Sequence, residues 1–224
     1  MPIIYGGVSA PSTTSAGDGS NLPALQGKQG ELLASELHGK YYTQNYRGNV
    51  YYSATAVAGV TLSVYSATSY TGHALWNPAG SGKNLVLIRA VATTVTVGAA
   101  MAALGFVVQT GVGSALGTAA PISAFTQVTA TRGPANFSQL VAGQGNSVAL
   151  VGSAATLTSA STLFIPCGVS ASTGAITTQQ TAIGVSEYFD GSIIIPPGTL
   201  FAWAQSIADA GTWNCSFHWE ETPL

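Results

Sequence analysis

Charged side chains are the scarcest feature of this 224-residue sequence. Only 6% of its residues are Asp, Glu, Lys or Arg, against about 25% in an ordinary soluble domain. Uncharged exterior surface promotes association, so we expect the chain to bury much of its surface in an assembly. The formal net charge is −2 and the six Lys and Arg residues are scattered, which argues against direct binding to nucleic acid.

Carboxylates are missing from the whole middle of the chain. None occurs between Gly48 and Ser186. The acidic residues that could converge for hydrolysis lie in the C-terminal segment and are Glu187, Asp190, Asp209, Glu220 and Glu221. Nothing in their spacing favours one catalytic pair.

Other catalytic and metal-binding patterns are absent as well. His38, His73 and His218 have no companion ligands at the spacing of a metal site. The sequence has no Gly-x-Ser-x-Gly elbow, and the segment 80–83 (Gly-Ser-Gly-Lys) has Asn77 where a phosphate loop needs Gly. We therefore expect a protein that is not an enzyme, with no metal site and no cofactor, and a turn at 80–83.

Cysteine is too rare to build a disulfide framework. Cys167 and Cys215 are the two cysteines, and the opening residues lack the basic and apolar regions of a secretory signal. We expect both thiols to stay reduced. Cys215 falls on the apolar face of a predicted strand, where a small buried hydrophobic residue is expected.

One stretch, Val91 to Val108, has about the length of a bilayer span. Its threonines, its β-branched residues and the central Gly98 favour two short strands joined by a turn. We expect no membrane-spanning segment.

Alternation of apolar and polar residues is clearest near the C-terminus. In the predicted strand Thr212–Glu220, one face carries Trp213, Cys215, Phe217 and Trp219. We predict that this strand forms a β-hairpin with Thr199–Ile207 through a turn at residues 209–211. A corner at Pro196-Pro197-Gly198 precedes the hairpin, because proline cannot donate to a ladder and glycine permits a turn.

Further strand-like segments alternate with Gly, Ser and Pro loops. They are predicted at Val60–Tyr65, His73–Trp76, Leu85–Thr96, Ala103–Gln109, Ile122–Thr129, Ser147–Gly152, Leu163–Val169 and Ile183–Phe189. So many strands without intervening helices predict an all-β, antiparallel β-sandwich. A jelly roll fits the number of strands and the length of the chain.

The N-terminal quarter has a different composition. Residues 1–22 are rich in Gly, Ser, Thr and Pro, and apolar residues at helical spacing predict a short helix at about residues 29–39. We assign residues 1–52 to an arm with a Tyr-rich docking segment and residues 53–224 to the sandwich. The predicted assembly anchors of the arm are Leu32, Leu33, Leu37, Tyr41, Tyr42, Tyr46 and Arg47. The alternative, in which the tyrosines pack on their own sheet, stays open.

Several segments resemble virion proteins of tailed bacteriophages, specifically head decoration or cement proteins with a jelly-roll core. The resemblance lies in Gly30–Tyr42, Tyr46–Val50, Asn77–Pro78, Lys83–Val86, Ile195–Gly198 and Trp219–Glu221. It implies a closed oligomer such as a homotrimer on the capsid surface of a virion assembled in the host cytoplasm. It also implies contacts with the major capsid protein and with other copies through the arm, and neither enzymatic activity nor a cofactor.

Four other functions compete with capsid decoration. A major capsid protein would be expected to carry more basic residues on its genome-facing surface, and a tail or fibre component could use the same sandwich. A carbohydrate-binding module could present Trp76 or Trp203 to a sugar, and a host glycan stays an open partner for exposed loops. A secreted adhesin would need the export signal that was not found.

Overall fold

The last strand, β11 (Thr212–Pro223), shows why the chain folds in two layers. Trp213, Cys215, Phe217 and Trp219 are at most 2% exposed, whereas Asn214 between them is exposed. Because side chains alternate across a strand, four buried groups on one face require a second layer of structure against that face. The predicted apolar face of this strand is confirmed.

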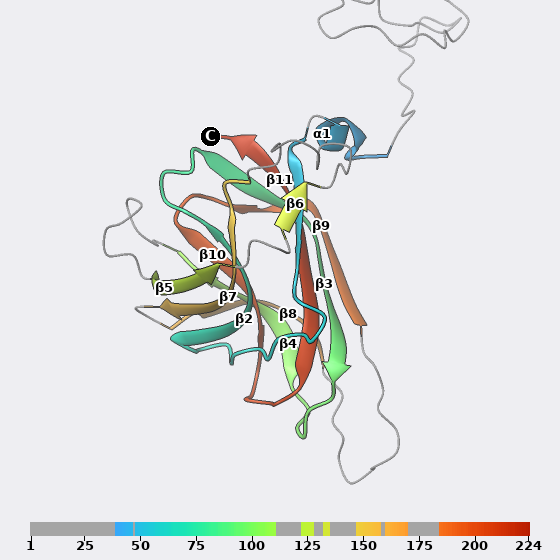
Figure 1. Ribbon diagram of the computed structural model, residues 1–224, viewed down its shortest axis with the longest axis vertical. Helices are drawn as coiled ribbons and strands as arrows, with labels where there is room; N and C mark the ends of the chain where they lie inside the picture. The colour runs from blue at the N-terminus through green and yellow to red at the C-terminus, as the bar shows by residue number, and fades with distance from the viewer. Residues whose placement is uncertain are drawn as a thin grey trace, which may run out of the picture. The chain divides into compact units, whose positions relative to one another are not determined.

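Strands form almost all of the regular structure in the computed structural model, which describes residues 39–46, 48–110, 122–127, 132–134, 147–157, 160–169 and 184–224 (Figure 1). The short helix α1 (Tyr42–Tyr46) comes first. The strands before β11 are β1 (Val50–Ala54), β2 (Ser69–Asn77), β3 (Lys83–Thr96), β4 (Ala103–Gln109), β5 (Ile122–Gln127), β6 (Arg132–Pro134), β7 (Leu150–Leu157), β8 (Thr162–Val169), β9 (Gly184–Ile195) and β10 (Thr199–Gln205). The predicted class, an all-β antiparallel sandwich, is confirmed.

The two sheets share one aromatic core. The five-stranded sheet has the order β6-β1-β11-β3-β9, and the six-stranded sheet has the order β5-β7-β2-β10-β4-β8. The ring of Phe106 on β4 lies 4.2 Å from Trp203 and 5.0 Å from Phe201, both on β10. Phe217 on β11 lies 5.8 Å from Phe201, so aromatic contacts connect the inner faces of both sheets.

Strand pairing is nested from the two ends of the chain toward its middle. β1 pairs with β11, β2 with β10, β3 with β9 and β4 with β8, all antiparallel. The segment between β4 and β8 contributes three additional strands. Of these, β7 pairs with β2, β5 pairs with β7, and β6 pairs with β1.

The predicted C-terminal hairpin is wrong. β10 and β11 follow each other in the chain but belong to different sheets. Residues 206–211 carry the chain across the gap between the sheets, which is about 10 Å in a sandwich. Both strands have apolar inner faces, and that pattern is the same whether two strands pair with each other or face each other. The corner at residues 196–198 performs the same change of sheet between β9 and β10.

The predicted strand Val60–Tyr65 is also wrong, because this segment crosses from one sheet to the other. Val60 forms a single bridge with Trp213 in the five-stranded sheet, and Val64 forms one with Gln205 in the six-stranded sheet. A segment that changes partner after a few residues cannot form a ladder.

The predicted division of Val91–Val108 into two strands is confirmed, since β3 ends at Thr96 and β4 begins at Ala103.

The chain divides into two compact units between Tyr42 and Thr43. The first, Met1–Tyr42, is described only at residues 39–42, so the predicted helix at 29–39 lies outside the described residues apart from Gly39. In the second unit, β1 begins at Val50. Residues 50–52, which the sequence analysis placed in the arm, therefore form the start of a strand that pairs with β11.

Replacing Gly98 by Ala is expected to lower the free energy of unfolding by about 2–4 kcal/mol. Gly98 lies between β3 and β4, and an added Cβ would overlap the carboxylate of Asp209. That carboxylate accepts hydrogen bonds from the backbone N–H groups of Ala100 and Gly211 at 3.2 and 3.4 Å. The Ala side chain would displace it from these donors. The midpoint of urea unfolding measures the effect.

Gly184 provides the matched control. It lies at the start of β9, and the nearest atom to an added Cβ is Thr93 Oγ1 at 3.8 Å, an ordinary contact. We expect Gly184→Ala to change the free energy of unfolding by less than about 0.5 kcal/mol. Equal effects of the two substitutions would contradict the proposed fit between Gly98 and Asp209.

Candidate functional site

The predicted assembly anchors are only partly described by the structure. Leu32, Leu33, Leu37 and Arg47 lie outside the described residues. Tyr42 is 46% exposed and Tyr41 is partly buried, while Tyr46 belongs to α1 and its side chain is not described. The Lys40 ammonium lies 5.2 Å from the centre of the Tyr41 ring. The role of these seven residues as anchors stays a prediction.

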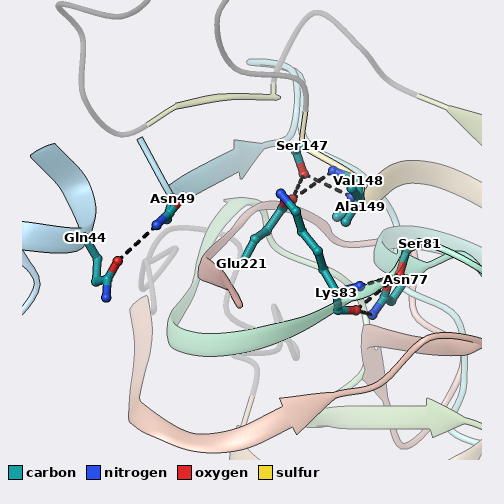
Figure 2. A network of polar contacts seen from close by, with 9 residues as sticks. All are labelled: Gln44, Asn49, Asn77, Ser81, Lys83, Ser147, Val148, Ala149 and Glu221. Atoms are coloured by element: carbon teal, nitrogen blue, oxygen red, sulfur yellow. Dashed lines mark hydrogen bonds and ion pairs between the residues drawn. The ribbon is translucent and has the colours of Figure 1, made fainter. Parts of the chain in front are cut away.

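A buried carboxylate lies at the centre of a network of polar contacts (Figure 2). Glu221, near the end of β11, has a side chain with 0% exposure. It accepts hydrogen bonds from Ser147 Oγ at 2.5 Å and from the backbone N–H of Val148 at 2.9 Å. The Nζ atom of Lys83 lies 3.0 Å from its other oxygen. We call Glu221, Ser147, Val148 and Lys83 the Glu221 cluster.

The Glu221 cluster joins segments that are far apart in the sequence. The backbone N–H of Glu221 donates to the carbonyl of Asn49 at 2.8 Å, and the Asn49 side chain donates to Gln44 Oε1 at 3.0 Å. Asn77 Nδ2 donates to the carbonyls of Lys83 and Ile195, each at 2.9 Å. Hydrogen bonds and the ion pair therefore tie the segment after α1, the start of β3 and the residues just before β7 to the end of β11.

This arrangement connects distant segments and keeps the Glu221 carboxylate out of reach of a substrate. Both oxygens of Glu221 are engaged by donors, and its side chain is closed to solvent. A general acid or base must reach the atom whose proton it transfers.

The predicted turn at residues 80–83 is confirmed, with positive φ at Gly80 and Gly82, and no ligand-binding role follows from it.

A second polar pair lies inside the sandwich. Ser53 on β1 and His73 on β2 share a hydrogen bond of 2.9 Å between Oγ and Nε2. Burial lowers the pKa of His73 to about 3, so its imidazole is neutral at neutral pH. The pair has the atoms of a nucleophile and its base, but Ser53 is 0% and His73 3% exposed. It is a structural hydrogen bond between the two layers.

The cysteines fit their expected structural role. Cys215 is 2% exposed, as predicted, and both thiols are free. Burial raises the pKa of Cys167 to about 12 and that of Cys215 further still, so neither is a reactive thiolate at neutral pH. Within the described part of the chain, no group of three His, Cys, Asp or Glu residues could hold a metal ion.

Trp203 is not available as a sugar platform. Its side chain is 0% exposed and packs in the core against Phe106, which corrects one of the two positions considered for a carbohydrate site. The structural reason is that Trp203 lies on the inner face of β10, where a stacked sugar could not enter. Trp76 is partly buried and packs against the apolar cluster of Tyr70 and Leu200.

A row of aromatic and basic side chains crosses the outer face of the five-stranded sheet. Tyr52 is in register with His218, His218 with Arg89, and Arg89 with Tyr188. The Arg89 guanidinium lies 4.7 Å from the centre of the Tyr188 ring, and its Nε donates to Ser186 Oγ at 3.0 Å. Burial and the Arg89 charge lower the pKa of His218. We call these four residues the sheet-face row.

Sequence reasoning missed both the sheet-face row and the Glu221 cluster. The alternation of β11 did place His218 opposite the apolar face, which was the available signal. The register that aligns Arg89 and Tyr188 with His218 depends on which strands pair, and a single sequence does not supply that information.

The fold and these sites define an all-β sandwich whose buried polar groups serve its structure. Comparison of the chain with protein-family models, curated proteins and solved structures gives no match. No described helix has the length and hydropathy needed to cross a bilayer.

Proposed function

We propose that this protein is a structural component of a tailed-bacteriophage virion that decorates or cements the capsid surface. The observation that carries the proposal is the scarcity of charge: 6% of the residues are charged, which suits a surface covered by neighbouring subunits. The buried polar groups support the same role, because Glu221, Ser53 and His73 are engaged within the sandwich. The protein is accordingly proposed not to be an enzyme and to need no cofactor.

We further propose that the sandwich is a jelly roll, the fold of many capsid proteins. The nested pairs β1–β11, β2–β10, β3–β9 and β4–β8 support this assignment. They are the pairs that result when one long hairpin of eight strands is rolled into two sheets. On this view, β5, β6 and β7 belong to an insertion in the connection between β4 and β8.

The N-terminal arm is proposed to supply the contacts with neighbouring subunits. Its anchors would be the seven residues named above, and its partners the major capsid protein and other copies of this chain, arranged as a homotrimer. A segment that orders on its neighbour adds contact area at an entropic cost. Since β1 begins at Val50, a test of the arm must leave the residues after 42 intact.

Deleting residues 1–38 should leave a folded sandwich that no longer binds capsids. The deletion keeps every residue of the second unit, Thr43–Leu224, so circular dichroism and the melting temperature should stay close to those of the full chain. Binding is measured by co-sedimentation with capsids of the phage that encodes the chain, after this protein has been stripped from them. The triple variant Leu32→Ala, Leu33→Ala, Leu37→Ala should weaken binding at least tenfold.

Two results would distinguish a failure of the proposed docking arm from a failure of the proposed virion role. If the deleted chain still binds capsids as tightly as the full chain, the arm is not the docking element. If purified phage particles contain none of this protein by mass spectrometry, the virion proposal itself fails. Electron microscopy of native particles, with the copies counted and located, distinguishes capsid decoration from a tail or fibre position.

A further inference from the structure

We propose that the outer face of the five-stranded sheet binds the same face of a second copy of this chain through a two-fold axis. This self-association does not depend on the virion role. It rests on the exposure, the charges and the dimensions of the face.

The face combines exposed apolar side chains with a central row of rings. Tyr188 and Ile194 on β9 are 65% and 57% exposed. Two rows flank the sheet-face row. They are Glu220, Val86 and Ile194 on one side, where Val50 of β1 is already buried within the chain, and Ala54, Ser216, Val91 and Ser186 on the other. Aromatic residues and Arg are enriched at protein interfaces, and this composition matches a contact surface.

The charges on these three rows are complementary to each other. Arg89 is the cation and Glu220 the carboxylate, and His218 between them is held toward its neutral form. Arg89 is oriented by Ser186 and Tyr188. Among the described residues, the Glu220 side chain has neither a hydrogen-bond nor an ion-pair partner, and burial raises its pKa. A partly desolvated carboxylate without a partner favours a contact that brings a cation to it.

Two-fold symmetry satisfies both charges at once. In such a contact, if residue i touches residue j of the second copy, then j touches i. Arg89 of one copy can therefore face Glu220 of the other, twice per dimer. Arg89 and Glu220 lie on the neighbouring strands β3 and β11 and in neighbouring rows, so that they are diagonal neighbours, with His218 opposite Arg89 and Val86 opposite Glu220. The axis then lies in the plane of the contact and runs near the line that joins His218 to Val86, so that each of these residues lies close to its own counterpart.

The face is large enough for a reversible contact. Four strands spaced about 4.8 Å apart, and rows repeating every ~7 Å along them, cover roughly 500 Å² when the row of Asn214, Thr93 and Gly184 is included. Two copies then bury about 1,000 Å², near the lower limit for specific interfaces. We therefore expect a dimer that dissociates on dilution.

Exchange of the two charges tests this contact in the full-length chain. Arg89→Glu and Glu220→Arg each place like charges opposite each other, and each should weaken association at least tenfold. The double variant Arg89→Glu, Glu220→Arg re-forms the opposite-charge pair and should restore association to within a few-fold of the original. Sedimentation equilibrium measures the mass of the particle in solution. Loss of a two-fold contact should halve this mass in each single variant, also if the arm holds further copies together.

Thr162→Glu is the control, because Thr162 is exposed on β8 in the other sheet and the mass should not change. The proposal is overturned if the single variants keep the mass of the original chain, or if the double variant stays dissociated while its circular dichroism is unchanged.

Should a charge variant fail to fold, Val86→Cys gives a second readout. Under mild oxidation it should form a disulfide-linked dimer, whereas Thr162→Cys should not, and a monomeric Val86→Cys would reject the axis.

Discussion

Replacing Glu221 by Ala should lower the free energy of unfolding by about 3–5 kcal/mol. The substitution removes the acceptor of Ser147 Oγ and of the Val148 N–H, which lie 2.5 and 2.9 Å from one Glu221 oxygen. The buried Ser147 hydroxyl and the partly buried Val148 N–H would both lose this acceptor. Lys83 would lose its counter-ion at 3.0 Å but can turn toward water. Chemical unfolding followed by tryptophan fluorescence measures the loss.

Glu220 is the natural control, because it is the preceding residue on the same strand and points to the opposite face. Its Ala variant should change the free energy of unfolding by less than about 0.5 kcal/mol. Lys83→Met should have an intermediate effect of about 1–2 kcal/mol, since Lys83 is 35% exposed and its charge is screened by solvent. Equal decreases in the free energy of unfolding for Glu220→Ala and Glu221→Ala would show that the contacts of the Glu221 cluster do not stabilise the fold.

Acid should destabilise the sandwich through His73. Burial lowers the pKa of His73 to about 3 from 6.5, so between these values the unfolded chain binds a proton that the folded chain does not. The stability due to a neutral His73 is therefore fully present above pH 6.5 and is lost as the pH falls toward 3. The full difference corresponds to about 4–5 kcal/mol. Urea unfolding measured at intervals from pH 7 to pH 4 would record this slope.

The double variant Ser53→Ala, His73→Phe should remove most of that slope. It replaces both members of the hydrogen bond by apolar groups of similar shape, and Phe can keep the stacking on Phe217, whose ring lies 5.2 Å from that of His73. At pH 7 its stability should lie within about 2 kcal/mol of the original. His218→Gln is the comparison, because His218 is partly exposed on the sheet-face row and should contribute less. An unchanged slope in the double variant would show that His73 does not cause the acid sensitivity.

These experiments separate two uses of polar groups in a chain that has few of them. Glu221 and His73 act inside the sandwich, where low dielectric makes an unpaired group costly. Arg89 and Glu220 lie on an outer face, and their proposed pairing requires a second copy. Stability measurements respond to the first set, and association measurements respond to the second.

Several features of the fold could be predicted because they follow from local pattern. The alternation in β11, the corner at residues 196–198 and the break at Gly98 all depend on neighbouring residues in the chain. The class of fold followed from the same pattern repeated along the sequence. Cys215 could be placed in the core because it shares a face with Trp213 and Phe217.

Features that depend on which strands become neighbours could not be predicted in this way. An apolar inner face looks the same in a hairpin and in two strands of opposite sheets, which is why β10 and β11 were paired incorrectly. Val60–Tyr65 has a strand-like composition, but its partners lie in two different sheets. Ser147 and Glu221 are far apart in the sequence, so no local pattern connects them.

The amino-acid sequence by itself determined the scarcity of charge, the alternating strands and the corners, because each is a property of residues close together in the chain. Only the tertiary structure decided the nested order of the strands, the partners of Glu221 and His73, and the alignment of Arg89 with Tyr188 and His218. The physical reason is that burial and pairing energies depend on distances between residues from remote segments, and folding alone sets those distances.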